Sequence, residues 1–290
     1  PVELVTGIKA FVGVASGQVF FLMSRGSRNC NQLTVLDGFC DSNKINVPIK
    51  NINASNQFSF QDTTSKELFA GIPLGELLDI SVGIVFSGST DSFLCSGQRN
   101  KFCYPYMTGG NLKYKFENPL PVTHFVDFTQ DLLLKVNSEF SQQNKKNVAV
   151  LGDYKRFKKE KIIIRQSSDA IVATVDNTGL AFPLNYFCAN LKDTSAVDLF
   201  YIMGILNSSI MTRIAQETGV IRRGQGKQPQ IRKSGLVTLP IPIPGDMNLI
   251  NLVSDLSLNI WISFNARQSN ETLLDELDRL SEQCFTLHNS

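Results

Sequence analysis

The sequence predicts an α+β fold, in which a mixed β domain with a buried helix follows an N-terminal β-hairpin region and precedes C-terminal amphipathic helices. Residues 161–176, KIIIRQSSDAIVATVD, hold two apolar runs of strand length on either side of a polar turn. Residues 195–216 are apolar on nearly all sides, as in a buried helix. Residues 247–287 place apolar side chains three and four positions apart, which predicts two amphipathic helices. Strand and helix signals therefore occur together in one chain.

The composition is that of an ordinary globular protein with one large domain or two modest ones. The chain has 290 residues, of which 42% are hydrophobic and 19% are charged. No apolar run reaches the roughly 18 to 20 residues that span a bilayer, so we expect no membrane segment and a cytoplasmic location. The first residues, PVELVTGIKAFVGVAS, form a broken apolar stretch without an initial Met, which favours a fragment over a secretory signal peptide.

The N-terminal region is predicted to be a β-hairpin followed by a connector. Residues 19–24 (VFFLMS) and 32–39 (QLTVLDGF) have strand composition and are joined by SRGSRN, which predicts two paired strands. Residues 43–67 are polar and rich in asparagine, with too few apolar positions for a regular element. We therefore expect three parts: an N-terminal β region with its connector, a mixed domain, and a helical segment. Their bounds are 1–67, 68–245 and 246–290.

Charge is distributed unevenly along the chain, although the formal net charge is only +2. Residues 98–165 hold thirteen basic side chains against six acidic ones, and residues 211–233 hold six against one. Residues 246–290 hold seven acids against two arginines. A basic surface attracts polyanions because each phosphate contact releases condensed counterions. The alternative is a solvated lysine surface, which we favour for the lysine pairs at 145–146 and 158–159.

The sequence contains no recognisable metal or redox motif. The six cysteines form no CxxC pair, and the two histidines lie far apart. These residues are Cys30, Cys40, Cys95, Cys103, Cys188, Cys284, His124 and His288. We expect the cysteines to be reduced and mostly buried, as free cysteines of intracellular proteins usually are. No metal site and no cofactor are predicted.

The first part of the mixed domain is predicted to lead into a basic strand. Residues 74–78 suit a short helix, and residues 82–86 suit a strand. Residues 105–116, PYMTGGNLKYKF, follow as a glycine-rich turn and a strand whose alternation puts Lys113 and Lys115 on one face. These two lysines are candidate phosphate contacts. The alternative is a half-buried strand that carries two solvent-exposed lysines.

Arg165 and Gln166 stand at the end of an apolar strand whose packing does not explain them. Arginine is the usual reader of guanine in the major groove and glutamine of adenine. Both side chains also bind phosphates or support loops.

The residues between 118 and 160 suggest a helix followed by a strand, and no site is predicted there.

Residues 219–236, GVIRRGQGKQPQIRKSGL, form a glycine-rich, basic loop without acids. Glycines let the backbone approach a phosphate closely, and the side chains supply donors for phosphates and base edges. The candidate DNA contacts in this loop are Arg222, Arg223, Gln225, Lys227, Gln230 and Arg232. The alternative is a mobile surface loop.

The two C-terminal helices leave three alternatives open. They can pack on their own domain, bind a partner helix or form a helix-mediated dimer. The heptad-like spacing in the second helix covers only about two repeats, so it does not decide between them.

Three motifs in order resemble the TaqI-like C-terminal specificity domain of N6-adenine DNA methyltransferases. They are KIIIRQSS from residue 161, GILNSSI at residues 204–210 and LPIPIP at residues 239–244. The turn PYMTGGNLKYKF is similar to a further family segment, and the resemblance covers about residues 72–244. It implies a target-recognition domain that binds double-stranded DNA beside a methyltransferase or endonuclease catalytic domain or subunit. It also implies that the N-terminal region, residues 1–67, is the tail of such a catalytic domain or a replacement for it.

The resemblance also bears on individual residues. Because Arg165 and Gln166 recur in the family whatever site is read, it implies phosphate contact or internal support for them. Asn207, Ser208 and Ser209 resemble the family signature at which the recognition fold closes. The alternative is that these polar residues bond to the backbone inside a helix or at its bend. Type I specificity subunits, which share the recognition fold, use helices such as those after residue 246 as spacers.

Catalytic motifs are missing, so we expect no catalytic residue in this chain. Adenine methylation needs an Asp/Asn-Pro-Pro-aromatic loop for the flipped base and a glycine-rich turn for S-adenosylmethionine. The segment most similar to this loop is Asn118-Pro119-Leu120-Pro121, which lacks the adjacent prolines and the aromatic residue. The sequence therefore predicts a DNA-recognition module of a restriction-modification system. The alternatives are a scaffold that acts through the C-terminal helices and, less favoured, an enzyme with an unrecognised site.

Overall fold

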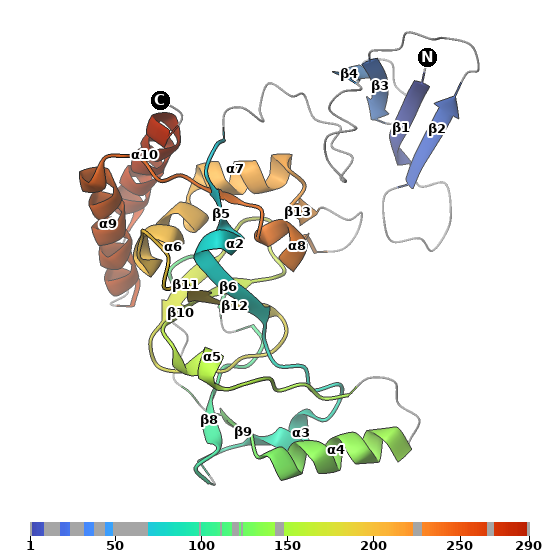
Figure 1. Cartoon of the computed structure of the whole chain (residues 1–290), viewed down its shortest axis with the longest axis vertical. Coiled ribbons are helices and arrows are strands. Elements are labelled where there is room, and N and C mark those ends of the chain that lie inside the picture. Colours follow the sequence, from blue (N-terminus) through green and yellow to red (C-terminus); the bar gives the residue numbers. More distant parts are fainter. Residues whose placement is uncertain are drawn as a thin grey trace.

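The computed structural model, drawn in Figure 1, describes four N-terminal strands and most of the chain after them. The described residues are 2–8, 18–23, 32–37, 44–48 and 69–288, without 99, 111, 118–121, 123, 143–147, 223–227 and 266–269. Sheets and helices occur together in an α+β fold, as the sequence predicts.

The four N-terminal strands form one sheet in the order β2-β1-β3-β4. They are β1 (Val2–Ile8), β2 (Gln18–Met23), β3 (Gln32–Asp37) and β4 (Lys44–Pro48). β1 lies between β2 and β3, antiparallel to β2 and parallel to β3. The predicted hairpin between β2 and β3 is therefore wrong, because β1 takes the place between them. β4 also corrects the predicted connector, since its backbone pairs with β3 despite its polar composition.

A four-stranded antiparallel sheet separates two hydrophobic cores in residues 69–288. Its order is β11 (Ala173–Asp176), β10 (Lys161–Arg165), β12 (Tyr186–Leu191) and β6 (Leu78–Val82). Ile162 and Ile164 belong to one core and Ile163 belongs to the other, because successive side chains of a strand point to opposite faces. Both faces of β10 are thus buried, which explains its continuous apolar run.

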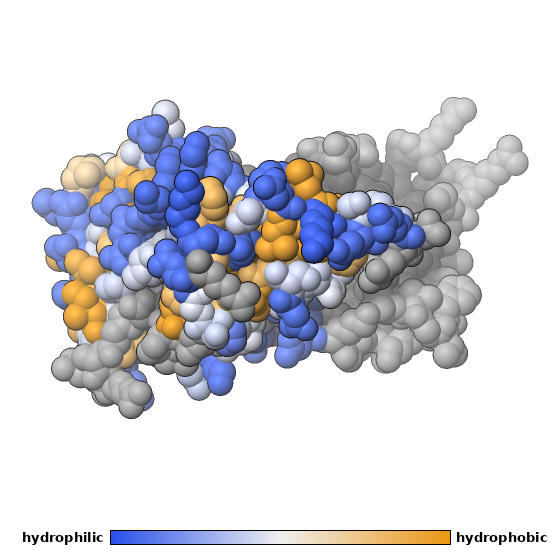
Figure 2. All heavy atoms as spheres, turned by 90° about the horizontal axis from the view of Figure 1, so that it is seen from below, coloured by the Kyte–Doolittle hydropathy of each residue, from blue (hydrophilic) through white to orange (hydrophobic). Residues whose placement is uncertain are grey.

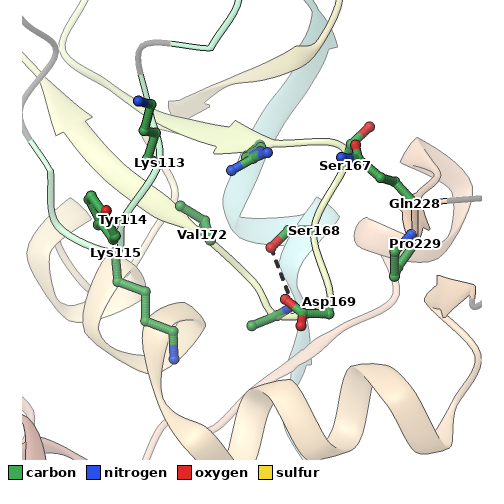
Figure 3. Close-up of a pocket in the computed structure, with 11 residues that line it drawn as sticks. Lys113, Tyr114, Lys115, Ser167, Ser168, Asp169, Val172, Gln228 and Pro229 are labelled. Carbon is green, nitrogen blue, oxygen red and sulfur yellow. Dashed lines mark hydrogen bonds between the residues drawn. The ribbon is translucent and has the colours of Figure 1, made fainter.

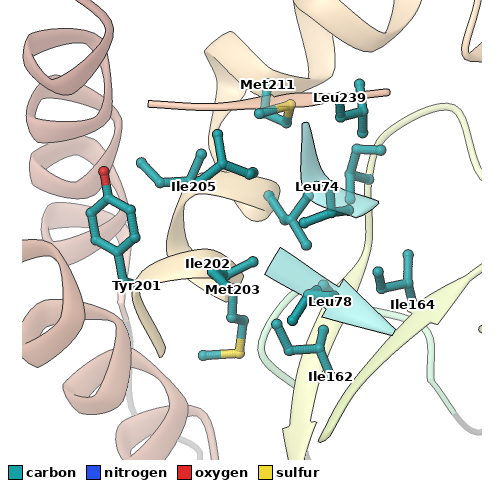
Figure 4. Packing of buried hydrophobic residues seen from close by; sticks show 14 of the residues in the cluster. Leu74, Leu78, Ile162, Ile164, Tyr201, Ile202, Met203, Ile205, Met211 and Leu239 are labelled. Carbon is teal, nitrogen blue, oxygen red and sulfur yellow. The ribbon is translucent and has the colours of Figure 1, made fainter. Parts of the chain in front are cut away.

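Helices cover one face of this sheet and build the larger core (Figures 1 and 4). They are α6 (Leu199–Asn207), α7 (Ser209–Glu217), α9 (Met247–Asn265) and α10 (Glu271–His288). Val253 of α9 and Leu277 of α10 are buried in the same core as Ile162 and Ile164. The C-terminal helices therefore pack on their own domain, which confirms one of the three alternatives.

The smaller core lies beyond the other face of the sheet, toward the bottom of Figure 1. It is enclosed by α3 (Thr90–Phe93), α4 (Gln130–Gln142) and a sheet in the order β7 (Leu94–Cys95), β9 (His124–Asp127), β8 (Cys103–Tyr106). Val136 and Phe140 of α4 are buried in it. Figure 2 shows the molecule from below, where hydrophilic side chains dominate the described surface and hydrophobic ones lie between them.

The two ends of the recognition region meet in space. β5 (Ile72–Pro73) pairs with β15 (Pro240–Ile241), and the Leu74 amide donates to the Leu239 carbonyl at 2.8 Å. The predicted short helix follows β5 as α2 (Leu74–Leu77). The Leu-Pro-Ile-Pro segment therefore closes the fold. None of the described helices is long and apolar enough to cross a membrane.

Candidate nucleic-acid interface

A pocket of about 620 Å³ opens where β10 runs into the turn before β11 (Figure 3). Three separate segments line it: residues 113–115, residues 165–172 and residues 228–229. The lining residues are Lys113, Tyr114, Lys115, Arg165, Ser167, Ser168, Asp169, Ala170, Val172, Gln228 and Pro229. The pocket thus brings together Lys113, Lys115 and Arg165, which the sequence singles out separately.

The segment around Lys113 is a turn, so the prediction of a basic strand is wrong. The Glu117 carboxylate accepts hydrogen bonds from the backbone amides of Lys113 at 2.5 Å and Tyr114 at 2.8 Å. Phe116 has a φ of 62° and buries its ring in the larger core, and its amide donates to the Ala173 carbonyl at 3.1 Å. These local bonds curl the chain and override the alternation of apolar and polar residues.

The turn gives Lys113 and Lys115 different roles. Lys113 is exposed, whereas Lys115 is half-buried and its Nζ donates to the Asn207 carbonyl at 2.6 Å. Burial lowers the pKa of Lys115, and the nearby Asp278 carboxylate opposes that shift. Lys115 therefore anchors the turn to the end of α6, and Lys113 is the lysine that faces solvent at the pocket.

Tyr114 is the most exposed aromatic side chain at this site, with 61% of its surface accessible. Its ring centroid lies 6.3 Å from that of Phe264 on α9. It stands between the two lysines and beside the pocket (Figure 3). An aromatic ring next to cationic side chains suits stacking on a base or on a sugar.

Arg165 is half-buried at the pocket and is held by its backbone, since its amide donates to the Val172 carbonyl at 3.0 Å. Within the described part of the chain, its guanidinium has no hydrogen-bond or ion-pair partner. Gln166 is fixed more firmly: its amide donates to the Asn185 carbonyl at 2.9 Å, and its carbonyl accepts from the Ile231 amide at 2.8 Å. The Gln166 backbone thus supports the fold internally.

The basic loop begins and ends in a short strand pair beside this turn. β13 (Ile221–Arg222) pairs with β14 (Gln230–Ile231), and Ser167 forms a bridge with Gln230. Gln230 is exposed, as is Arg232, which precedes α8 (Lys233–Leu236). Arg223, Gln225 and Lys227 lie outside the described residues, as does the side chain of Arg222.

The Asn-Ser-Ser segment between α6 and α7 bonds to backbone and to α10. The buried Asn207 side chain donates to the Ala173 carbonyl at 2.9 Å and accepts from the Ala173 amide at 3.0 Å. Ser208 caps α7 by accepting from the Met211 amide at 3.3 Å. The Ser209 amide donates to the Asp278 carboxylate at 2.7 Å. The backbone-bonding interpretation of this motif is confirmed for Asn207 and Ser208.

Not every basic residue of the central segment contributes to a surface. Lys161 is fully buried and forms an ion pair with Asp176, its cross-strand neighbour, while also donating to the Phe157 carbonyl at 2.5 Å. Arg156 is half-buried, and burial lowers its pKa. The thirteen basic residues counted in the sequence therefore overstate the positive surface.

Cysteines and potential metal ligands form no metal centre and no disulfide in the described part of the chain. Cys95, Cys103, Cys188 and Cys284 are free and buried, while Cys30 and Cys40 lie outside the described residues. Burial raises the pKa of the Cys188 thiol to about 11. Among the residues that the structure describes, no three His, Cys, Asp or Glu side chains gather as metal ligands.

Sequence reasoning missed Asp169 and the two serines before it as pocket residues. The sequence places them in a polar turn between two strands, RQSSDA, and nothing in that pattern marks the turn as part of a pocket. Their position depends on β14, which lies more than 60 residues further along the chain and packs beside the turn. A charged residue in a turn that follows an apolar strand is the one signal available.

Comparison with known proteins places these features in a family context. Residues 104–241 match the model of the TaqI-like C-terminal specificity domain. A Methanocaldococcus jannaschii protein named "Putative type II restriction enzyme and methyltransferase RM.MjaORFECS2P" is 26% identical over 210 residues. That match covers 70% of this chain and 16% of the relative, so the chain corresponds to a small part of the relative's length.

Among the solved structures, the match to one restriction-modification enzyme shows a likeness in fold. The type IIL restriction-modification enzyme MmeI, solved in complex with DNA, matches 99% of this chain with a TM-score of 0.51 and 10% identity. This chain covers 42% of that enzyme. The HsdS subunit from Thermoanaerobacter tengcongensis matches 76% of this chain and 44% of its own length, with a TM-score of 0.39 and 14% identity.

Proposed function

We propose that this chain is the sequence-specific DNA recognition module of a restriction-modification system, because residues 104–241 match the model of the TaqI-like C-terminal specificity domain. It binds double-stranded DNA and supplies specificity, while the chemistry belongs to a methyltransferase or endonuclease catalytic domain or subunit. The name of the M. jannaschii relative combines both activities, which supports such a partner. In this proposal residues 1–67 are the tail of the catalytic domain.

One observation carries the proposal: three segments far apart in the sequence meet at one pocket with cationic side chains at its wall. Lys113 is exposed, and Arg165 has no partner within the described residues. Gln228 belongs to the end of the basic loop and lines the same pocket. Side chains with unused donors next to a basic loop suit phosphates and base edges. The DNA contacts proposed are Lys113, Arg165, Arg222, Arg223, Gln225, Lys227, Gln230 and Arg232, with the Gln166 side chain beside them.

Lys115 departs from this set. The sequence makes it a phosphate contact, but its Nζ donates to the Asn207 carbonyl. A half-buried lysine whose ammonium group already donates to a carbonyl is less able to reach a phosphate. We therefore assign Lys115 to holding the turn that presents Lys113 and Tyr114.

The alternative of a protein-interaction scaffold has little exposed apolar surface on the C-terminal helices. The apolar stripes of α9 and α10 are buried in the larger core. Leu252 and Ile262 remain exposed on α9, at 55% and 52%. A helix-mediated dimer through them stays a prediction.

Binding to a randomised duplex pool tests the proposed function. Fluorescence anisotropy with the full chain at about 50 and 200 mM salt is expected to show affinity that falls steeply with salt, because Lys and Arg release counterions from phosphates. Sequencing of the bound fraction is expected to recover a short motif. Absence of binding even at the lower salt concentration would refute a module that recognises DNA without its catalytic partner.

A further inference from the structure

We propose that Asp278 of α10 is a positioning residue for DNA recognition, because it holds the joint on which the turn of Lys113 and Tyr114 rests. Asp278 acts through other residues and is not itself a DNA contact in this inference. It lies outside residues 104–241, so the family model gives it no role. The inference rests on the proposed function, since it names a residue that orients the proposed DNA contacts.

The Asp278 carboxylate binds the first residue of α7. It accepts hydrogen bonds from both the hydroxyl and the amide of Ser209, the amide at 2.7 Å. The first amides of a helix lack partners within the helix, and the helix dipole stabilises a carboxylate at that end. Ser208 caps the same end with its own side chain. α10 thus fixes where α7 begins, and with it the short joint between α6 and α7.

The joint holds the DNA-facing turn through Lys115. The Asn207 carbonyl, two residues before Ser209, accepts from Lys115 Nζ at 2.6 Å. The Asn207 side chain is bonded to both backbone groups of Ala173 in β11, at 2.9 and 3.0 Å. The Phe116 amide donates to the same Ala173 carbonyl at 3.1 Å. Because these bonds share their partners, a displaced joint displaces Lys115 and the turn with it.

Asp278 also acts on Lys115 through its charge. Burial lowers the pKa of Lys115, and the Asp278 carboxylate opposes that shift, so it favours the charged ammonium group. A charged donor makes the stronger hydrogen bond to the Asn207 carbonyl. Lys113 and Tyr114 come directly before this anchor and line the pocket (Figure 3). A sequence-specific contact depends on such support more than a general attraction to phosphates does.

Two acids of α10 are replaced in the full chain to separate position from charge. Asp278→Ala and Asp275→Ala each remove one negative charge, and Asp275 is exposed one turn earlier on the same helix. The preference is the affinity for the duplex recovered from the randomised pool relative to that for random duplex. Asp278→Ala is expected to lower this preference about two- to thirtyfold. Its affinity for random duplex is expected not to fall, because a negative charge is lost. Asp275→Ala is expected to keep the preference.

Hydrogen exchange in the absence of DNA tests the positioning itself. The amides of Lys113 and Tyr114 donate to the Glu117 carboxylate within the turn. These two amides are expected to exchange faster in Asp278→Ala than in the wild type, because the turn opens more often when its anchor is loosened. Asp275→Ala is expected to exchange as the wild type does.

A combined variant tests whether Asp278 acts through the turn. Once Lys113→Ala and Tyr114→Ala have removed the side chains that the turn presents, adding Asp278→Ala is expected to cost no further preference. A further loss as large as that of Asp278→Ala alone would contradict this route.

The outcomes separate the inference from the proposed function. An equal loss of preference in Asp278→Ala and Asp275→Ala would show an effect of charge and overturn the inference, as would unchanged preference or unchanged exchange in Asp278→Ala. If circular dichroism shows that Asp278→Ala does not fold, Ser209→Ala, which removes one of the two donors, is measured in its place with the same expected direction. If the wild-type chain binds no duplex, the proposed function fails and the recognition role fails with it, whereas the exchange rates still decide whether Asp278 positions the turn.

Discussion

At the residue scale, the positions that matter are polar groups whose partners come from distant parts of the chain. Asn207 shows this most clearly, because its side chain satisfies both the amide and the carbonyl of Ala173 and its own carbonyl accepts from Lys115. The Asn-Ser-Ser motif is therefore a joint between α6, β11 and the turn at Lys113. A motif can identify a fold by what it holds together without touching the ligand.

Lys113 and Lys115 are expected to respond differently to replacement, although one residue separates them. Lys113→Ala is expected to lower the slope of log affinity against log salt by about one, and to leave stability unchanged, because one phosphate contact is lost at an exposed site. Lys115→Ala is expected to cost about 1–3 kcal/mol of unfolding free energy, because the Asn207 carbonyl loses its charged donor. Urea unfolding and the salt series measure the two effects. A Lys115→Ala chain with wild-type stability would contradict its role as an anchor.

At the element scale, the crossing of α6 over α9 sets how the C-terminal helices attach. A Cβ at Gly204 would lie 2.1 Å from the Ser257 hydroxyl oxygen, so a larger residue clashes there while Ser257 keeps its present conformation. Gly83 meets a similar limit, since a Cβ there would lie 2.1 Å from the Pro183 carbonyl oxygen. Such close approaches fix the spacing of the layers on which the pocket turn is mounted.

Gly204→Ala is expected to destabilise the chain by about 1–3 kcal/mol through overpacking against Ser257. Ser257→Ala removes the clashing oxygen, so the double variant is expected to recover part of that loss. Thermal or urea unfolding of the two single variants and the double variant gives the coupling. If the changes in unfolding free energy were additive, the contact between Gly204 and Ser257 would not be the cause of the loss.

Element types were largely predictable, and their pairing was not. The buried run at β10, the apolar helix region at residues 195–216 and the amphipathic helices each carry a local periodicity. The parallel pairing of β1 with β3 has no local signal, because it depends on contacts between residues 31 positions apart, such as Glu3 and Thr34. The strand predicted at Lys113 is a turn, because the backbone amides of Lys113 and Tyr114 donate to the Glu117 carboxylate and not to a neighbouring strand.

At the scale of the whole molecule, two cores on opposite faces of one sheet hold the pocket at a fixed place. The sheet contributes Arg165, a turn packed on α6 contributes Lys113, and the loop that ends in β14 contributes Gln228. Lys113 and Arg165 could be chosen from the sequence as candidates, but their convergence could not, since each belongs to a different segment. Asp169 was missed because its turn becomes part of a pocket only when β14 packs beside it.

The most direct test of the central claim compares two variants of equal charge change on the DNA duplex recovered from the pool. Lys113→Ala with Arg165→Met removes two positive charges at the pocket, and Lys158→Ala with Lys159→Ala removes two exposed ones beyond the opposite end of β10. We expect the pocket variant to lose most of the preference for the recovered motif over random duplex, while the control variant keeps it. Equal loss in both variants would contradict it, because recognition would then follow net charge and not the pocket.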